Sequence, residues 1–247
     1  MNYSINILHL YPDLLNLYGD KGNIESFKRR LLWRNIEANV VVCTEKEPDF
    51  DLSDIDIVFL GGGSDRELLK VRTLIGDKKA ELKTFVENGG VMLACCGGFQ
   101  LLGQSYKTPE IDMECLGILD ITSEFKETEK RLIGDAVLEN DELGMIVGFE
   151  NHGARTNIGD YTPLGKVLSG FGNDGESGFE GVVYKNLLGT NLHGPLLPKN
   201  PKLCDKLLKS ALLNKYPDFT ELTSLDDTLE NSANEYIIQN FMKSDTK

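Results

Sequence analysis

The sequence predicts an α/β fold with a mostly parallel sheet that is flanked by helices and carries an antiparallel extension. Three observations favour it. Up to residue 103, short apolar and β-branched runs alternate with stretches of helical periodicity. The apolar run that begins at residue 91 leads through two cysteines and two glycines into a helix-forming run, which is typical of a sharp turn above a parallel sheet. After residue 115, short strand-like runs separated by turn residues replace the helical stretches, as in antiparallel sheets.

The parallel half is expected to begin with a strand at 4–10 and a turn-rich segment. Asn23 is then expected to cap a helix that runs to about residue 35, because apolar residues recur there at helical spacing. Further strands are predicted at 38–43 and 55–60 and from residue 91, and further helices at 65–74 and 78–88.

The second half predicts strands at 116–121, 131–137, 145–149, 181–184 and 187–192, followed by a helix at 202–213. The tail after residue 216 is acidic. It predicts an amphipathic helix that uses Leu225, Leu229, Tyr236, Ile237 and Phe241. We therefore expect one domain over residues 1–216 and an acidic C-terminal tail over residues 217–247.

Composition excludes several classes of function. The formal charge of −13, from 26 basic and 39 acidic residues, argues against non-specific binding of nucleic acid. No apolar run is long enough for membrane insertion, and no signal peptide is expected. The five cysteines have irregular spacing, which indicates reduced thiols and a cytoplasmic location. Neither CxxC nor HExxH occurs, so no metal site is expected.

The segment from Val91 to Gly103 predicts a nucleophile elbow, the sharp strand-to-helix turn that lifts one side chain above a parallel sheet. Cys96 would stand at this turn, because Gly97 and Gly98 follow it at once. A helix N-terminus beside the thiol would favour the thiolate. Cys95 ends the buried strand and is expected to be an inert hydrophobic residue.

A thiolate nucleophile needs a proton carrier, and the chain has three histidines for this role. His193 ends a predicted strand and precedes a Gly-Pro turn, so it can face the same sheet edge as the elbow. We favour it over His152, which lies in a polar loop. His9 lies within the first strand and is expected to be structural.

Acyl transfer also needs donors for the developing oxyanion. Gly62 lies in a glycine triplet that follows a predicted neighbouring strand, and its N–H could pair with that of Gly97. The alternative is an ordinary strand-to-helix turn. A phosphate-binding loop is not favoured, because no Gly-Lys-Ser/Thr follows.

Together these parts resemble the class I glutamine amidotransferases, and the Cys-Gly-Gly-Phe-Gln elbow is similar to the cobyric acid synthase-type branch. Residues 10–23, 148–156 and 192–201 are similar to the glutaminase subunits of bacterial lipid II isoglutaminyl synthases. The resemblance covers about residues 4–214 and leaves out the tail.

The resemblance implies that Cys96 attacks the side-chain amide of L-glutamine and that His193 passes a proton to the departing ammonia. A thioester would form and then be hydrolysed. Arg131 aligns with the substrate-binding arginine of the family; otherwise it is a solvated charge. Many class I enzymes carry an acid two residues after the histidine, but this chain has Pro195 there. Another group of this chain or a water could orient the imidazole, and we favour an acid from a partner.

The chain has no ATP-binding motif and no expected cofactor of its own. By resemblance, ATP and Mg²⁺ belong to a Mur ligase-like synthetase subunit, which would activate the α-carboxyl of D-glutamate in lipid II for conversion to D-isoglutamine. Lipid II would bring the complex to the inner face of the cell membrane. The alternatives are a cobyrinate-type amidotransferase, a cysteine hydrolase that does not use glutamine, and a catalytically inactive regulatory subunit.

Overall fold

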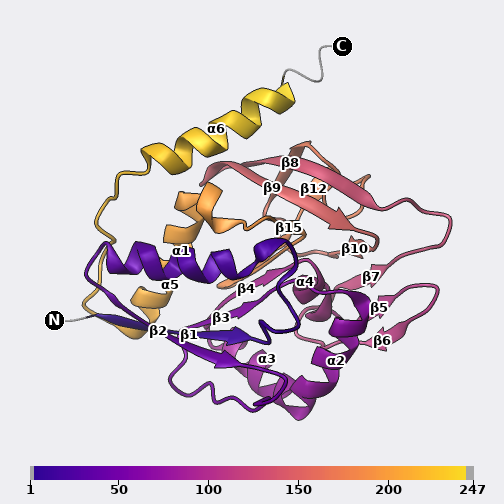
Figure 1. Ribbon diagram of the computed structural model, residues 1–247, viewed down its shortest axis with the longest axis horizontal. Helices are drawn as coiled ribbons and strands as arrows, with labels where there is room; N and C mark the ends of the chain where they lie inside the picture. The colour runs from indigo at the N-terminus through magenta and orange to yellow at the C-terminus, as the bar shows by residue number, and fades with distance from the viewer. Residues whose placement is uncertain (1–2, 243–247) are drawn as a thin grey trace.

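The structure is a computed structural model that describes residues 3–242, and a six-stranded sheet forms its centre (Figure 1). In spatial order its strands are β13 (Val182–Tyr184), β14 (Leu187–Thr190), β4 (Val91–Cys95), β3 (Ile57–Leu60), β1 (Ser4–Leu10) and β2 (Glu37–Cys43). Every neighbouring pair is parallel except β13 with β14. The predicted α/β fold with a mostly parallel sheet is therefore confirmed.

Helices cover both faces of this sheet because its strands are apolar on both sides. Alternate residues of β1 belong to two different cores: Leu8 and Leu10 to one, Ile5 and Ile7 to the other. The first core is closed by α2 (Asp65–Ile75) and α3 (Lys79–Glu87), which a 3₁₀ turn, η2 (Gly76–Lys78), joins. The second core is closed by α1 (Lys21–Leu32) and α5 (Pro201–Lys215).

Most of the predicted antiparallel extension forms two separate sheets. The strands predicted at 181–184 and 187–192 instead supply β13 and β14 of the central sheet, where β13 is antiparallel to β14 and β14 is parallel to β4. The four-stranded sheet has the order β10 (Arg155–Asn157), β7 (Thr122–Glu124), β5 (Ser105–Lys107) and β6 (Asp112–Glu114). The five-stranded sheet has the order β12 (Phe179–Glu180), β11 (Gly165–Ser169), β8 (Leu132–Asn140), β9 (Gly144–His152) and β15 (Leu192–His193).

Several sequence-based expectations about local structure were wrong. His152, which was expected in a polar loop, is a buried residue at the end of β9. The apolar run 116–121 forms no strand, because its amides at Leu116 and Ile118 bond the carbonyls of Leu101 and Leu102 at the end of α4 (Gly97–Leu101). Helix α1 begins at Lys21 rather than after Asn23, and Asp20 occupies its cap position. Asn23 lies inside the helix, where its side chain accepts a hydrogen bond from the Leu197 amide in η3 (Leu197–Lys199).

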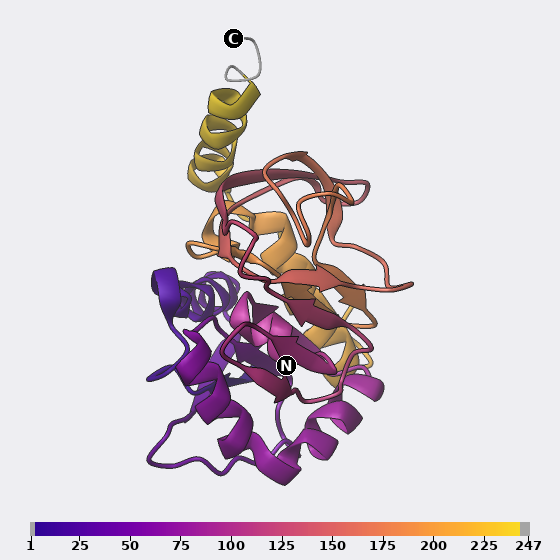
Figure 2. The ribbon, with the colours of Figure 1, turned by 90° about the vertical axis from the view of Figure 1, so that its right-hand side faces the viewer.

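The tail ends in a helix, α6 (Thr228–Met242), which projects from the body of the molecule in both views (Figures 1 and 2). Leu229 and Tyr236 on this helix are exposed, while the side chain of Phe241 lies outside the part that the structure describes. Among residues 3–242, no helix combines the length and apolar character that a bilayer crossing requires.

An ion-pair cluster fastens the start of this tail to the body. The guanidinium of Arg30 contacts Asp205 of α5 and Asp227 of the tail, each at 2.6 Å, and its side chain is only 4% exposed. The side chain of Arg34 adds a contact at 2.7 Å to the carbonyl oxygen of Thr223. The segment before α6 is therefore packed against α1.

Replacing Arg30 with alanine should lower the free energy of unfolding by about 2 kcal/mol, because Asp227 loses its buried cation while both acids keep some access to water. Urea unfolding measures this change. Arg29→Ala on the exposed side of α1 is the matched control and should change stability by no more than about 0.5 kcal/mol. Equal effects of the two substitutions would contradict the anchoring role.

Candidate active site

Cys96 stands at a strained turn between β4 and α4. Its φ of 47° is positive, which a residue with a side chain adopts only under constraint. Its backbone amide donates a hydrogen bond to the carbonyl of Thr190 at 2.6 Å, which holds the turn against β14. At Gly98 an added Cβ would lie 2.6 Å from the carbonyl oxygens of Leu60 and Gly61, so only glycine fits there. The predicted elbow geometry is thus present.

The two adjacent cysteines differ in environment. Cys95 is fully buried, and burial raises the pKa of its thiol well above the ordinary value. Cys96 is 7% exposed and faces polar groups. Burial also works to raise the pKa of Cys96, but the nearby imidazole of His193 outweighs it, and the pKa of Cys96 is lowered. The chain therefore holds one inert and one acidic thiol side by side.

His193 is fully buried beside Cys96. An added Cβ at Gly62 would lie 2.6 Å from Cε1 of His193 and 3.3 Å from Cβ of Cys96, so the two side chains flank the same glycine. The ring nitrogen Nδ1 lies 3.3 Å from both carboxylate oxygens of Asp20. Within residues 3–242, Nε2 has no hydrogen-bond partner, which leaves it as the nitrogen available to the thiol.

Cys96, His193 and Asp20 stabilise one another's charged forms. Burial works to lower the pKa of His193, but Cys96 and then Asp20 outweigh it and raise that pKa to about 10. With the lowered pKa of Cys96, this favours a thiolate–imidazolium pair at neutral pH. Such a pair combines a nucleophile with the proton that a leaving group needs.

Asp20 is the acid that contacts His193, and the sequence analysis did not identify it. It is fully buried, and its Oδ2 also accepts a hydrogen bond from the Gly62 amide at 2.7 Å. The contact with His193 corrects the expectation that a partner supplies the orienting acid, since this chain supplies one itself. Gly62 was expected to donate its amide to the oxyanion, but that amide already donates a hydrogen bond to Asp20. The glycine instead allows the imidazole of His193 to approach closely.

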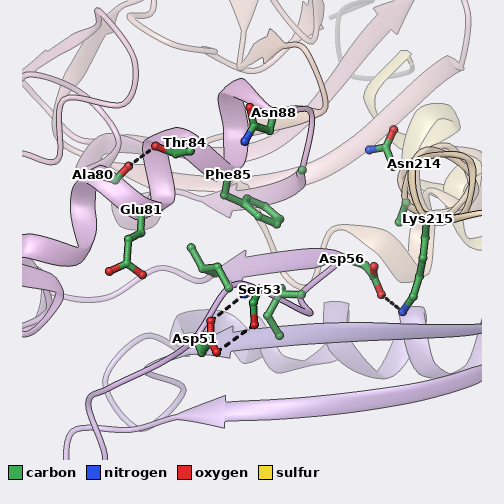
Figure 3. A pocket seen from close by; sticks show the side chains of 14 residues that line it. Asp51, Ser53, Asp56, Ala80, Glu81, Thr84, Phe85, Asn88, Asn214 and Lys215 are labelled. Carbon is green, nitrogen blue, oxygen red and sulfur yellow. Dashed lines mark hydrogen bonds and ion pairs between the residues drawn. The ribbon is translucent and has the colours of Figure 1, made fainter.

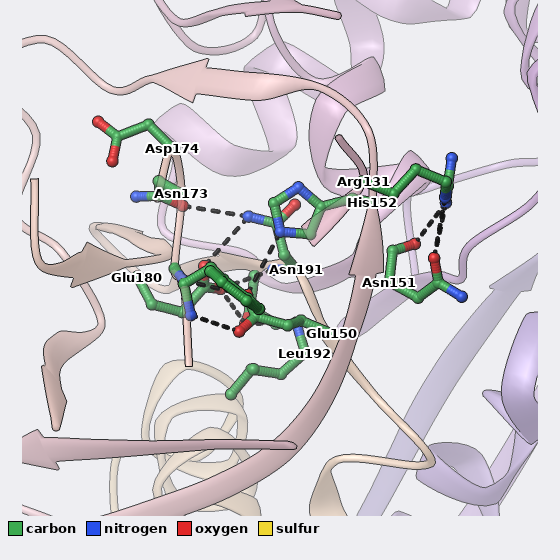
Figure 4. A network of polar contacts seen from close by, with 12 residues as sticks. Arg131, Glu150, Asn151, His152, Asn173, Asp174, Glu180, Asn191 and Leu192 are labelled. Atoms are coloured by element: carbon green, nitrogen blue, oxygen red, sulfur yellow. Dashed lines mark hydrogen bonds and ion pairs between the residues drawn. The ribbon is translucent and has the colours of Figure 1, made fainter. Parts of the chain in front are cut away.

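A buried polar network fixes the backbone that carries His193 (Figure 4). Glu180 accepts hydrogen bonds from the Thr190 hydroxyl at 2.7 Å and the Asn191 amide at 2.6 Å. On β9, the carboxylate of Glu150 accepts hydrogen bonds from the backbone amides of Phe171 and Gly172 at 2.6 Å and 3.0 Å. Buried carboxylates need such donors, so the residues just before His193 are held in one conformation.

The two other histidines make different contacts. His152 Nδ1 lies 2.8 Å from the Ala154 carbonyl oxygen and Nε2 lies 3.4 Å from Glu150, so both nitrogens face acceptors (Figure 4). His9 packs against Phe59 with ring centroids 5.3 Å apart, and burial lowers its pKa to about 4. Of the three, only His193 has an acid at one nitrogen and the thiol beside it.

The remaining predicted residues lie around the pair. Gly97 follows Cys96 as the first residue of α4, where a helical amide has no acceptor within its own helix. Arg131 is exposed and lies just before β8; its Nε and Nη2 contact Asn151 Oδ1 at 3.0 and 2.9 Å (Figure 4). Asn151 lies two residues beyond Phe149, which pairs with His193. Arg131 thus stands at the rim of the site.

A hollow of about 610 Å³ lies at the opposite edge of the central sheet (Figure 3). Asp56 and Gly90, which line it, precede β3 and β4, whereas Cys96 follows β4. The ion pair of Lys215 with Asp56 at 2.7 Å closes one side. The strands of the central sheet therefore separate this hollow from the thiol of Cys96.

Comparison with known proteins agrees with this geometry. Residues 6–201 match the model of the CobB/CobQ-like glutamine amidotransferase domain. The chain is 45% identical to the GatD subunit of the glutamine-hydrolysing lipid II isoglutaminyl synthase of Staphylococcus aureus, over 96% of both chains. The Streptococcus pneumoniae protein of the same name is 40% identical, over 95% of this chain and 91% of its own.

The fold is also similar to that of PurLQS from Thermotoga maritima. The TM-score is 0.53 at 18% identity, and the match covers 86% of this chain and 99% of the other. At this identity, the likeness concerns the fold alone.

The alkylation of Cys96 should reveal its acidity. Because the pKa of Cys96 lies below the ordinary thiol value, the thiolate and hence rapid reaction with iodoacetamide should persist as the pH falls below that value. His193→Gln removes the cation but not the burial, so the inflection should move to higher pH. His9→Gln, which removes an uncharged buried ring, is the control and should leave the inflection in place. One inflection shared by all three proteins would refute the ion pair.

Asp20→Asn should lower kcat for glutamine hydrolysis at least about a hundredfold with little change in KM. The amide can still pair with Gly62, but it no longer favours the tautomer in which Nδ1 of His193 carries hydrogen. Steady-state kinetics measure the loss, and a circular dichroism spectrum like that of the unchanged protein would show that folding is intact. Undiminished kcat would exclude Asp20 as the orienting acid.

Proposed function

The chain belongs to the CobB/CobQ-like glutamine amidotransferase family, and we propose that it is the glutaminase subunit of a lipid II isoglutaminyl synthase. One observation carries the proposal: a buried Cys96–His193–Asp20 group stands on a strained elbow, in a chain that matches the GatD subunits over nearly its whole length. The enzyme hydrolyses glutamine, and its ammonia serves the amidation of lipid II in peptidoglycan synthesis.

The geometry supports a two-step reaction. The thiolate of Cys96 attacks the side-chain carbonyl carbon of L-glutamine, and the tetrahedral intermediate collapses as imidazolium His193 gives its proton to the departing nitrogen. Ammonia leaves and a γ-glutamyl thioester remains. Neutral His193 then takes a proton from water as the water attacks the thioester, which releases glutamate and restores the ion pair.

Two further groups are assigned by the proposal. The Gly97 amide donates to the oxyanion of the intermediate, since it lies next to the nucleophile and has no intrahelical acceptor. Arg131 holds the glutamine, because its guanidinium contacts Asn151 of β9, the strand that pairs with β15 and so lies beside His193. Among residues 3–242, the hydrogen bonds of its guanidinium to Asn151 use Nε and Nη2, so we assign Nη1 to the ligand.

The product explains why a second subunit is needed. Ammonia that escapes into neutral water becomes mostly ammonium, which has no lone pair for attack. From the resemblance to the lipid II isoglutaminyl synthases, we infer that the partner is a Mur ligase-like subunit. It would receive the ammonia directly and use ATP and Mg²⁺ to activate the α-carboxyl of D-glutamate in lipid II. The complex then meets its lipid-linked substrate at the inner face of the membrane.

The decisive assay uses the chain co-purified with its ligase-like partner, lipid II and ATP. Cys96→Ala should abolish amidation from glutamine, because no thioester can form, while amidation from added ammonium chloride continues. Mass spectrometry of the stem peptide reads both reactions. Loss of both would show that Cys96 supports the assembly rather than ammonia release, and retention of both would exclude it as the nucleophile.

A further inference from the structure

Tyr18 occupies an unusual place beside the imidazole. It lies in a 3₁₀ turn, η1 (Leu17–Gly19), with φ of 54° and ψ of 22°, a left-handed conformation that a bulky residue rarely adopts. Its ring centroid lies 5.1 Å from that of His193 and 5.4 Å from that of Phe149. Although Tyr18 is 44% exposed, the imidazole behind it is fully buried.

The backbone on both sides of Tyr18 is fixed to the site. The amide of Leu17 bonds the carbonyl of Gly62 at 3.0 Å, and the side chain of Asp20 accepts the amide of the same glycine at 2.7 Å. The Lys21 amide bonds Asn16 Oδ1 at 2.9 Å, which closes the turn. These bonds hold the left-handed conformation, and strain that is kept in this way is common where a side chain must be aimed.

The hydroxyl of Tyr18 continues the chain of contacts toward the rim. It accepts a hydrogen bond from Asn151 Nδ2. The side-chain oxygen of Asn151, Oδ1, accepts hydrogen bonds from Nε and Nη2 of Arg131 at 3.0 Å and 2.9 Å. The backbone carbonyl of Asn151 accepts another from Nη2 at 2.8 Å. One amide side chain thus uses both ends, one for the tyrosine and one for the guanidinium.

We propose that Tyr18 and Asn151 are positioning residues that hold Arg131 in its glutamine-binding orientation, while the Tyr18 ring covers His193. The three residues form a clasp, the Tyr18 clasp, that spans from the imidazole to the guanidinium. The proposal rests on the proposed glutaminase function. It adds that ground-state binding of glutamine depends on the tyrosine hydroxyl, and proton transfer on the tyrosine ring.

Substitutions separate the two parts of Tyr18. Tyr18→Phe keeps the ring and should raise the glutamine KM about three- to tenfold with kcat unchanged, since one hydrogen bond is lost. Asn151→Ala should raise KM at least as much. The double variant should be no worse than Asn151→Ala, because both changes break one chain of contacts. Tyr18→Ala should also lower kcat, because the imidazole loses its cover.

The kinetics are measured on the complex with the ligase-like partner, and melting temperatures check that each variant folds. Tyr184→Phe is the control: its hydroxyl contacts Glu87 at 3.1 Å on the far edge of the central sheet, and its loss should change neither constant. An unchanged KM in Tyr18→Phe, or strictly additive effects in the double variant, would overturn the proposal.

A second readout needs no glutamine. Arg131 held toward the thiol should make Cys96 react faster with iodoacetate, an anion, relative to neutral iodoacetamide. Tyr18→Phe and Asn151→Ala should lower this ratio and Tyr184→Phe should not. If the unchanged complex fails to hydrolyse glutamine, the proposed function is wrong. The ratio of the iodoacetate rate to the iodoacetamide rate still tests whether Tyr18 and Asn151 position Arg131, and equal ratios in all variants would overturn that proposal.

Discussion

The buried carboxylate of Asp20 is the group on which the rest of the site depends. A carboxylate with no access to water is costly unless charges and donors surround it. Here the imidazole of His193 supplies the charge and the Gly62 amide supplies a donor, at 3.3 Å and 2.7 Å. Because one side chain holds both, the histidine and the loop after β3 cannot move independently. The position of the imidazole over Cys96 follows from this constraint.

The surrounding structure serves to keep that arrangement rigid. The elbow of Cys96 is tied to β14 through Thr190, and Glu180 ties Thr190 and Asn191 together just before the histidine. The turn that carries Asp20 is bonded to Gly62 through Leu17. Rigid surroundings of this kind keep a reactive pair within proton-transfer distance. The site is thus assembled from the carboxyl ends of parallel strands, where chemistry gathers in such sheets.

Sequence patterns revealed those parts of the molecule whose geometry is local. The elbow of Cys96 and the strand-end position of His193 follow from neighbouring residues, and so does the alternation that defines the central sheet. The sequence did not predict Asp20 as the acid beside His193, because Asp20 lies in a turn more than a hundred residues before the histidine and no periodic pattern marks it. Gly62 was placed at the correct edge, but the direction of its amide depends on a peptide plane that Asp20 fixes from outside the strand. The run 116–121 is apolar because it is buried, not because it pairs with a neighbouring strand.

The protonation state of the His193 ring decides whether Cys96 and His193 form an ion pair. In ¹⁵N-labelled protein at pH 8, NMR should show both ring nitrogens carrying hydrogen, because Cys96 and Asp20 raise the pKa of this ring to about 10. Cys96→Ala should bring the titration of the ring to lower pH. A neutral His193 ring at pH 7 in the unchanged protein would contradict the thiolate–imidazolium pair and the role of Asp20 together.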